Sequence, residues 1–251
     1  MNNHATPPKG VILITGASSG VGEAVARSMV ELIKSAADQS GGHELVLLGR
    51  SAQKLTELQA ELRGDMSPVT AYAGDITDVG YLGSVLSPII AMGKRLSVVV
   101  HCAGMGRFGK HDEVKLGDID EMIATNILGT AVLLQSVIPV MKEARAGHLV
   151  VVTSDVARRP LEEGAIYSAS KYAQSSMVAS IRKEVQPFGI RVSEVLPGLI
   201  DTNFHAEPAG SPAHHDWLQP TDVAWWIQAV VCAPQHVVVD EVMIHPLSQR
   251  Y

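Results

Sequence analysis

The sequence predicts an α/β protein in which a doubly wound, seven-stranded parallel sheet carries helices on both faces of a single domain. Three observations lead to this prediction. Short apolar runs alternate with amphipathic segments along the chain, which is typical of parallel strands joined by crossover helices. The first apolar run ends in a glycine-rich turn, Thr15–Gly22. The 251 residues contain no internal repeat, low-complexity tract or linker, and this length suits one domain.

Seven apolar runs have the length and the β-branched composition of buried strands. These runs are Val11–Ile14, Leu45–Leu48, Val69–Tyr72, Leu96–Val100, His148–Thr153, Ile190–Leu196 and Val237–Ile244. Between them, apolar residues recur at helical spacing, so helices are expected to connect the strands. The expected helices are Val21–Ile33, Ala52–Leu62, Val79–Met92, Ile119–Ala144, Ala173–Val185 and Asp222–Val231.

Composition excludes several classes of protein. Hydrophobic residues make up 46% and charged residues 18% of the chain, which indicates a globular protein. A net charge of -6 without a basic cluster argues against nucleic acid or an anionic membrane as the main partner. The polar segment Met1–Lys9 lacks a signal peptide pattern, and no apolar run approaches the roughly 20 residues that span a bilayer. Cys102 and Cys232 have no partner at metal-ligand spacing, so we expect no metal and a cytoplasmic location.

The glycine-rich turn favours phosphate binding, because glycines let backbone amides approach a phosphate at the start of a helix. Its spacing is neither Gly-x-Gly-x-x-Gly nor that of a P-loop, and a purely structural turn is the alternative. Gly16-Ala-Ser18-Ser-Gly20 also matches the nucleophile elbow of α/β hydrolases, with Asp240 and His245 as conceivable triad partners. That elbow needs an oxyanion loop after an earlier strand, for which Met1–Lys9 leaves no room. We keep the hydrolase as an alternative of a different class.

A second group of residues points to proton transfer. Tyr167 and Lys171 are four residues apart, so they share one face of a helix. Tyrosine has a free pKa of about 10, and a neighbouring ammonium lowers this pKa towards neutrality. Ser154, at the end of a predicted strand, is placed to hydrogen-bond the reacting oxygen. The alternative is an ordinary surface pair of tyrosine and lysine.

Taken together, these motifs resemble the short-chain dehydrogenase/reductase family from end to end. The family's Thr-Gly-x-x-x-Gly-x-Gly is similar to Thr15–Gly22, and its Tyr-x-x-x-Lys to Tyr167–Lys171. Its serine thirteen residues before the tyrosine matches Ser154. Further matches are the helix asparagine, the acid after the third strand, and the Pro-Gly after the sixth strand with a following threonine: Asn126, Asp75, Pro197, Gly198 and Thr202.

The resemblance implies one NADP(H)-binding Rossmann domain over residues 1–251 and a role for each matched residue. Tyr167 would carry the proton, Ser154 would polarise the substrate oxygen, Lys171 would hold the nicotinamide ribose, and Asn126 would support a water that relays protons. Structural alternatives remain for Asn126, which could satisfy helix backbone, and for Asp75, which could cap a helix. The implied cofactor-binding residues are Gly16, Ser18, Ser19, Gly20, Val21, Gly22, Arg50, Asp75, Ile76, Ala103, Gly104, Asn126, Tyr167, Lys171, Pro197, Gly198, Ile200 and Thr202. The implied substrate-binding residues are Met105, Phe108, Ser154, Tyr167 and Phe204.

Several positions depart from the family pattern. His101-Cys102 replaces Asn-Asn, and His101 is interpreted as a packed, hydrogen-bonded histidine rather than a catalytic one. Asp155 replaces a small residue, and the pair Arg158–Arg159 either meets a substrate carboxylate or is an exposed loop charge without a ligand. The long connection Lys34–His43 resembles that of sepiapterin-reductase-like members. The stretches Met105–Gly109 and Asp240–Pro246 resemble the same branch and, equally, the branch acting on small 3-hydroxy acids.

The segment Asn203–Gln219 is expected to form a mobile substrate loop with aromatic contact residues. Its histidines lack a third ligand at metal spacing, which again predicts no metal site. In relatives, the long helix and the helix after Tyr167 pair across a two-fold axis, with Leu128, Val132, Met177 and Val178 as candidate contacts here. The resemblance therefore implies a homodimer or homotetramer.

The residues at the end of the second predicted strand indicate whether the cofactor is NAD(H) or NADP(H). NAD-binding relatives carry an acid there, which would repel a ribose phosphate. Here the strand ends Leu47-Leu48-Gly49-Arg50, and Arg50 is suited to bind that phosphate. The alternative is that Arg50 only caps the turn or stacks on adenine. The resulting hypothesis is an NADP(H)-dependent reductase of a small ketone or aldehyde; the alternatives are a sepiapterin-type pterin reductase, a 3-hydroxy acid dehydrogenase and a nucleotide-sensing binding protein.

Overall fold

A computed structural model describes residues 7–35, 42–63, 68–205 and 207–250 of the chain. Its centre is one sheet of seven parallel strands in the order β3-β2-β1-β4-β5-β6-β7, which confirms the predicted fold class. The strand order reverses between β1 and β4, and a ligand cleft is expected at the carboxyl ends of the strands beside that reversal. The strands are β1 Gly10–Thr15, β2 His43–Gly49, β3 Val69–Ala73, β4 Leu96–His101, β5 Gly147–Val152, β6 Ile190–Pro197 and β7 Glu241–Ile244.

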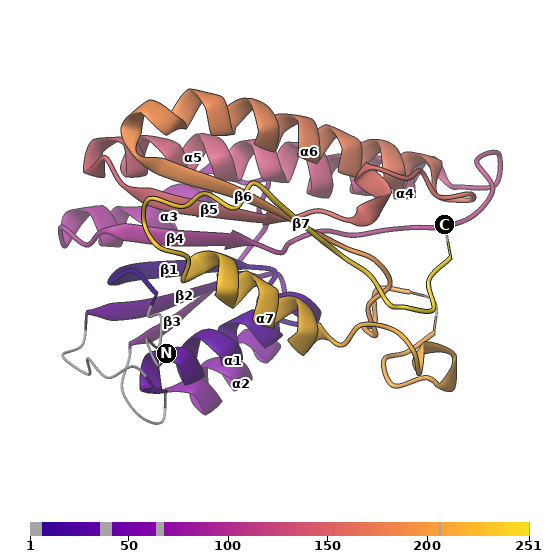
Figure 1. The fold of residues 1–251 in the computed structure, drawn as a ribbon, viewed down its shortest axis with the longest axis horizontal. Coiled ribbons are helices and arrows are strands. Elements are labelled where there is room, and N and C mark those ends of the chain that lie inside the picture. Colours follow the sequence, from indigo (N-terminus) through magenta and orange to yellow (C-terminus); the bar gives the residue numbers. More distant parts are fainter. Residues whose placement is uncertain (1–6, 36–41, 64–67, 206, 251) are drawn as a thin grey trace.

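Helices cover both faces of the sheet (Figure 1). One face carries α1, α2 and α7 over a hydrophobic core, and the other carries α3, α5 and α6 over a second core. β4 and β6 are buried along their whole length, as expected for strands sandwiched between helices. The helices are α1 Gly20–Ser35, α2 Ala52–Leu62, α3 Val79–Ala91, α4 Leu116–Met122, α5 Gly129–Ala144, α6 Ala165–Val185 and α7 Pro220–Val231.

Three elements differ from the sequence prediction. Helix α6 begins at Ala165 instead of Ala173, because its first two turns bury polar residues of the site, which an apolar periodicity does not reveal. The strand β7 begins at Glu241, four residues later than the apolar run Val237–Ile244 indicates. The predicted helix over Ile119–Ala144 is continuous, but it contains a π-helical segment, Ile123–Leu128, between α4 and α5. Such segments commonly occur at functional sites.

The stretch Leu116–Ala144 is the one described helix that is long and apolar enough to cross a membrane, judged by length and composition alone. Its α5 part packs against β4, α3 and α6. Leu133, Val137 and Met141 of this helix are fully buried in the core. Packing within the fold therefore accounts for its apolar composition. The long connection Lys34–His43 lies largely outside the described residues.

Candidate active site

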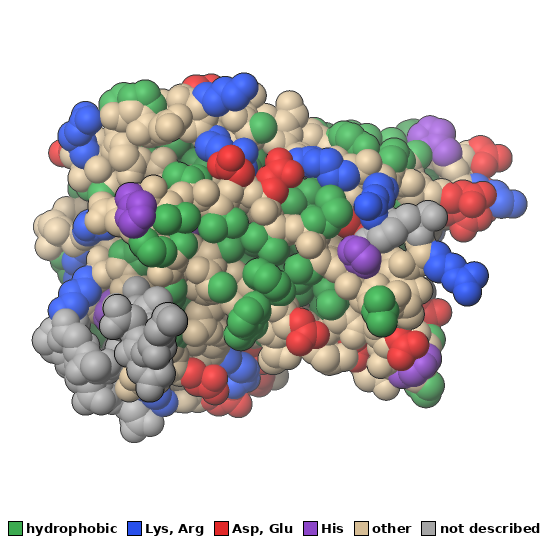
Figure 2. Space-filling model, viewed as in Figure 1, with side chains coloured by type: hydrophobic (Ala, Val, Ile, Leu, Met, Phe, Trp, Pro, Cys, Tyr) green, Lys and Arg blue, Asp and Glu red, His purple; other side chains and the backbone are tan. Residues whose placement is uncertain are grey.

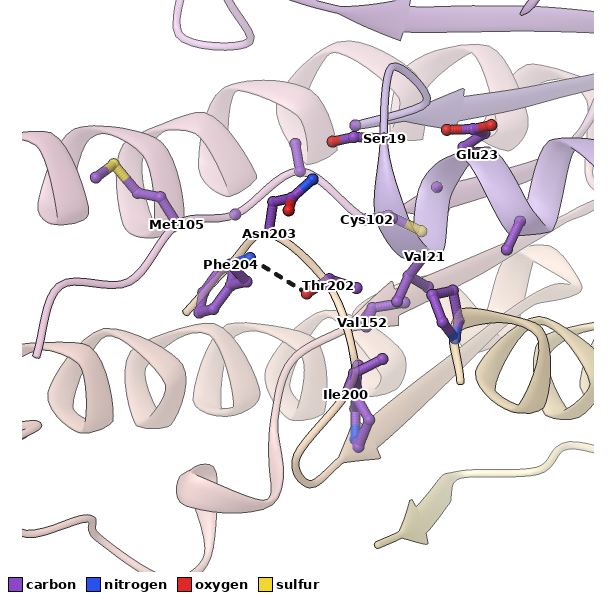
Figure 3. A pocket seen from close by; sticks show the side chains of 18 of the residues that line it. Ser19, Val21, Glu23, Cys102, Met105, Val152, Ile200, Thr202, Asn203 and Phe204 are labelled. Carbon is purple, nitrogen blue, oxygen red and sulfur yellow. Dashed lines mark hydrogen bonds between the residues drawn. The ribbon is translucent and has the colours of Figure 1, made fainter. Parts of the chain in front are cut away.

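A cleft of about 1290 Å³ opens at the carboxyl ends of the central strands. It runs from the end of β2, past the turn between β1 and α1, to the loops that follow β4, β5 and β6. Figure 3 shows Val21 at the start of α1, Met105 after β4, and Ile200 and Phe204 on the loop after β6 around this cleft. Every predicted cofactor and substrate residue lines the cleft, except for Asn126, which is fully buried beside it.

The glycine turn is shaped for close approach of a ligand. Gly16 and Gly20 have φ values of 68° and 56°, a region that favours glycine. A Cβ at Gly22 would collide with the carbonyl group of Gly16, so the helix α1 starts directly against the turn. The turn and the first residues of α1 line the cleft, which is where a phosphate cradle is expected. The turn fits the pyrophosphate of a dinucleotide.

The far end of the cleft is formed by the ends of β2 and β3. A Cβ added at Gly49 would lie only 2.9 Å from Ser18 Oγ. The glycine therefore lets the end of β2 pack closely against the glycine turn. Arg50 follows it and is exposed along the cleft. Asp75 Oδ1 accepts hydrogen bonds from Thr77 N and Thr77 Oγ1, both at 2.8 Å, and these bonds lower the pKa of the Asp75 carboxyl. Asp75 therefore orders its own turn, and the charge of Arg50 also stabilises its ionised form.

A different acid caps α3: Asp78 Oδ1 accepts a hydrogen bond from Tyr81 N at 3.1 Å. The structural alternative for Asp75, that it caps the helix after it, is therefore wrong. Ile76, its neighbour, is buried and packs beneath Gly129 of α5.

The side chain of His101 is buried beneath the turn after β4 and is hydrogen-bonded through both ring nitrogens. Its Nδ1 hydrogen-bonds Thr15 Oγ1 at 2.7 Å, and its Nε2 hydrogen-bonds Thr130 Oγ1 at 2.9 Å. Burial lowers the pKa of His101 to about 3, so the ring is neutral at physiological pH. The prediction of a packed histidine is confirmed. Thr15 Oγ1 also accepts a hydrogen bond from Ala103 N at 3.2 Å, which ties the glycine turn to the Ala103–Gly104 segment.

Asn126 lies in the π-helical segment and is fully buried. Its Oδ1 accepts a hydrogen bond from Met105 N at 2.9 Å, and its Nδ2 donates to Met105 O at 2.8 Å and to Ser170 Oγ at 2.9 Å. The side chain thus satisfies the backbone of the loop after β4 rather than that of its own helix. A Cβ at Gly104 would lie 3.2 Å from Lys171 Nζ and 3.4 Å from Asn126 Oδ1, so both groups pack closely against this glycine.

Ser154, Tyr167 and Lys171 converge at the centre of the cleft. Ser154, directly after β5, is hydrogen-bonded to Tyr167. Lys171 is one turn further along α6, and its Nζ lies 5.8 Å from the centroid of the Tyr167 ring. All three residues are more than nine-tenths buried. A tyrosine hydroxyl, a serine hydroxyl and an amine in one enclosed site can bind an oxygen atom and move a proton to or from it.

Electrostatics at this centre differ from the sequence expectation. Burial raises the pKa of Tyr167, although the hydrogen bond with Ser154 acts in the opposite direction. Burial also lowers the pKa of Lys171 to about 8, although Cys102 and Glu194 act in the opposite direction. The expectation that Lys171 brings the pKa of Tyr167 down is therefore wrong for this arrangement. Tyr167 holds its proton at neutral pH, which is the form required of a proton donor.

The loop after β6 closes one side of the cleft. Gly198 N donates a hydrogen bond to Ile244 O at 2.8 Å, which fixes the loop to β7. Thr202 lies opposite the glycine turn, because a Cβ at Gly20 would be 3.4 Å from Thr202 Cγ2. Thr202 Oγ1 also accepts a hydrogen bond from Phe204 N at 3.3 Å, drawn as a dashed line in Figure 3. Pro197, Gly198, Ile200 and Thr202 are therefore brought to one wall, as predicted.

Aromatic rings surround Tyr167 at the substrate end. Phe108 meets the Tyr167 ring edge-on at 5.2 Å between centroids, and Phe204 lies 5.7 Å from it. His205 stacks on Phe108 at 5.7 Å. Met105 is buried in the same cluster. Sequence reasoning placed Met105, Phe108 and Phe204 here and missed His205, which it had noted only as part of the loop.

Two polar residues beside Ser154 were not among the predicted site residues. Asp155 is 4% exposed and lines the cleft. Its Oδ1 accepts a hydrogen bond from Ser154 Oγ at 3.2 Å, and its Oδ2 accepts one from Gln249 Nε2 at 2.6 Å. The only sequence signal for Asp155 was its replacement of a small residue, and Gln249 carried no signal at all.

Arg158 is an exposed loop residue, as one of the two sequence interpretations expected, but its charge is paired within the protein instead of being directed at the cleft. Its guanidinium pairs with Glu194, which is fully buried, at 3.3 Å and with Glu241 at 2.8 Å. It also donates to Ser175 Oγ at 2.7 Å. Arg158 therefore holds the loop after β5 against β6, β7 and α6.

Buried polar contacts anchor the segment Asn203–Gln219. The ring of His214 stacks on Trp217 at 3.9 Å, and its Nδ1 hydrogen-bonds Asp201 Oδ1 at 2.8 Å. His214 is thus a packed anchor of the loop. In the described part of the chain, no three His, Cys, Asp or Glu side chains are grouped as metal ligands.

With this geometry established, comparison with known proteins identifies the family. A family model described as short chain dehydrogenase matches residues 10–210. The chain belongs to this family. An uncharacterised oxidoreductase of Staphylococcus aureus (strain USA300) is 30% identical over 237 residues, which are 94% of this chain and 97% of the relative.

Two solved structures share the fold closely. An alcohol dehydrogenase from the archaeon Thermococcus sibiricus, complexed with 5-hydroxy-NADP, is 29% identical with a TM-score of 0.85, and the match covers 96% of this chain and 98% of that chain. The closed form of a serine dehydrogenase complexed with NADP+ is 25% identical with a TM-score of 0.85, and the match covers 96% of each chain. This short-chain dehydrogenase therefore carries its predicted motifs on a fold shared along nearly the whole chain.

Proposed function

We propose that this short-chain dehydrogenase is an NADP(H)-dependent oxidoreductase that interconverts a small carbonyl compound and its alcohol. The observation that carries the proposal is the convergence of Ser154, Tyr167 and Lys171 beside a glycine turn that fits a pyrophosphate. The two structural relatives are named as an alcohol dehydrogenase and a serine dehydrogenase, which supports chemistry at an alcohol or carbonyl group.

In the proposed mechanism, the bound cofactor supplies or accepts the hydride. Tyr167 donates its hydroxyl proton to the carbonyl oxygen during reduction, and in its deprotonated form it takes the proton of the alcohol during oxidation. Ser154 hydrogen-bonds the same oxygen and holds it beside Tyr167. Lys171, charged below about pH 8, would hold the cofactor ribose, and its charge would stabilise the deprotonated Tyr167 that forms after proton donation. Asn126 fixes the backbone of Met105 and so keeps this side of the cleft in place.

We propose NADP(H) rather than NAD(H) because the cation Arg50 follows β2. NAD-binding relatives carry an acid at this strand end, and an acid would repel the ribose phosphate of NADP(H). Arg50 lies along the cleft at that point, and Ser18 Oγ lies close by, against Gly49. A guanidinium makes paired, charge-assisted hydrogen bonds to a phosphate. Both structural relatives are described as complexes with NADP-type ligands, which supports the same choice here.

The hydrolase alternative is not supported by the arrangement of the strands. The elbow-like Ser18 follows β1, whereas Asp240 and His245 flank β7 at the edge of the sheet. Three strands, β4, β5 and β6, separate these elements, so the triad is not assembled. The nucleotide-sensing alternative remains a second candidate, and it is distinguished by turnover.

We further propose that the protein is a homodimer or homotetramer formed by identical chains. Leu128 is exposed on the α4–α6 side, whereas Val132 and Val178 are buried in the chain's own core and are not available as contacts. Hydrophobic side chains also gather at the centre of the face over α7 and β7 (Figure 2). Trp225 of α7 and Met243 of β7 are exposed. Light scattering at micromolar concentration should give two or four times the 26.7 kDa of one chain, and a 26.7 kDa species alone would contradict the proposal.

The enzymatic proposal is tested by mixing the purified protein and NADPH with a panel of ketones, diketones, 3-oxo acids and sepiapterin. Loss of NADPH absorbance, with formation of an equal amount of alcohol, is the expected result for at least one compound. Tight NADPH binding without turnover of any compound in either direction would favour the nucleotide-sensing alternative.

A further inference from the structure

The buried carboxylate of Asp155 is not used by the proposed mechanism, although it lies beside the reacting centre. Asp155 Oδ1 accepts the hydrogen bond of Ser154 Oγ, and Ser154 is itself hydrogen-bonded to Tyr167. An oxygen bound by Ser154 and Tyr167 therefore lies one hydroxyl group away from a carboxylate. A substituent on the carbon next to the reacting carbon would be within reach of Asp155.

The surroundings of Asp155 favour its use as an acceptor. Burial raises the pKa of its carboxyl, whereas hydrogen bonds from Gln249, Ser154 and Val156 and the charge of His245 favour the ionised form. A carboxylate in such a site gains most from a ligand that brings a positive charge, because the pair offsets the cost of burying each charge.

The other side of the reacting centre is apolar. Phe108 and Phe204 pack edge-on and tilted against the Tyr167 ring, and His205 stacks on Phe108. A ligand that fits both sides carries an apolar or aromatic group towards these rings and a proton donor towards Asp155.

A ligand with a carboxylate, instead of a proton donor, directed towards Asp155 is disfavoured. It would face Asp155, and the nearby cation Arg158 is already paired with Glu194 and Glu241. The cleft thus argues against a 3-hydroxy acid bound with its carboxylate beside Ser154.

We propose that Asp155 selects substrates with an ammonium group on the carbon next to the reacting carbon, that is, 1,2-amino alcohols and the corresponding α-amino ketones. This inference rests on the proposed function. In oxidation, Tyr167 in its deprotonated form would take the hydroxyl proton, the cofactor would accept the hydride from the hydroxyl-bearing carbon, and the ammonium group would stay unchanged and paired with Asp155. In reduction, both transfers run in the opposite direction.

Calorimetric titration of the NADP+-loaded protein at pH 7 tests the inference. The probes are 2-amino-1-phenylethanol and 1-phenyl-1-propanol, in which a methyl group replaces the ammonium, together with 1-phenyl-1,2-ethanediol. We expect the amine to bind about tenfold or more tighter than the methyl compound, the scale of one charge-assisted hydrogen bond. In Asp155→Asn this preference should fall to about threefold or less, with little change in affinity for the methyl compound and for NADPH.

The matched control is Asp118→Asn, which removes the same charge from α4, where Asp118 pairs with Arg107 at 3.5 Å. This control should keep the preference for the amine. Equal binding of amine and methyl compound by the wild type, retention of the preference in Asp155→Asn, or binding of the diol as tightly as the amine would each overturn the inference.

Turnover separates the inference from the proposed function. If the wild type oxidises 1-phenyl-1-propanol with NADP+ but shows no preference for the amine, the inference fails and the proposed function stands. If the Asp155-dependent preference is present but no alcohol or carbonyl compound turns over, the binding site stands and the proposed function fails.

Discussion

The two ends of the cleft are built in different ways. The cofactor end consists of strand ends and a glycine turn, where backbone geometry at Gly16, Gly20 and Gly22 decides what fits. The substrate end consists of side chains, such as Asp155 and Phe108, that come from distant parts of the chain. The cofactor end is therefore fixed by local sequence, whereas the substrate end depends on how loops meet in the folded protein. The predictions below test this difference, starting with the residue at which the two ends meet.

Tyr167→Phe should have the largest effect. The substitution removes the hydroxyl that carries the proton and keeps the ring packing with Phe108 and Phe204. We expect turnover to fall by roughly 100-fold or more, the usual scale for loss of an acid–base group, with little change in NADPH affinity. Steady-state kinetics on the best substrate give the measurement. Tyr172→Phe, an exposed tyrosine on the same helix, is the control and should turn over normally; near-normal turnover of Tyr167→Phe would contradict the mechanism.

Arg50→Ala tests the cofactor end. Loss of the guanidinium should weaken NADPH binding by about 2 kcal/mol, or roughly 30-fold, and leave NADH binding almost unchanged. Dissociation constants from fluorescence titration check this. Arg107→Ala, which removes an arginine from the substrate end of the same cleft, should not discriminate between the two cofactors. An equal loss for both cofactors in Arg50→Ala, or a wild type that prefers NADH, would show that Arg50 does not read the phosphate.

Arg158→Ala tests the ion pairs that hold the loop after β5 in place beside the substrate end. It leaves the fully buried Glu194 without its cation, although Arg158 itself is 34% exposed. Because solvent screens part of the pair, we expect the free energy of unfolding to fall by about 1–2 kcal/mol, below the usual cost of breaking a buried pair. Urea unfolding at fixed protein concentration gives the value. The double variant Arg158→Ala/Glu194→Gln should recover part of the loss, and a double variant less stable than the single one would argue against the pairing.

The buried His101 beneath the cofactor end should give a smaller effect, which is a dependence of protein stability on pH. Burial lowers the pKa of His101 to about 3 in the folded protein, whereas an ordinary histidine has a pKa of about 6.5. Between these values the unfolded chain binds more protons, so stability falls as the pH is lowered through this range. For His101 alone we expect a loss of about 1 kcal/mol between pH 7.5 and 5.5. Urea midpoints of wild type and His101→Asn across this range should diverge in slope; parallel curves would mean that His101 does not titrate this way.

Much of the fold and of the cofactor end could be predicted from the sequence. Strands buried on both faces, such as β4, appear as continuous apolar runs, and the glycine turn has few alternatives for its backbone. The start of α6 could not be predicted from periodicity, because Ser168 and Lys171 are polar yet buried. Lys171, for example, is buried against Gly104 of the loop after β4, which is far away in the sequence.

The substrate end was predicted less completely. Phe204 and Phe108 were found because the resemblance marks their loops, but Gln249 reaches Asp155 from 94 residues away. The ion pairs of Arg158 were not predicted, because its partners, Glu194 and Glu241, lie on strands whose neighbours only the folded sheet defines. Pairing between distant charges has no signature in local spacing.

The pH dependence of turnover in both directions tests most directly the claim that the hydroxyl of Tyr167 is the proton carrier. Because the pKa of Tyr167 is raised by burial, carbonyl reduction at saturating NADPH should be nearly independent of pH between 6 and 8. Alcohol oxidation should rise with pH over the same range, and Tyr167→Phe should lose both activities. A reduction rate that falls with rising pH through an apparent pKa near 7, or that keeps its pH profile in Tyr167→Phe, would contradict the account.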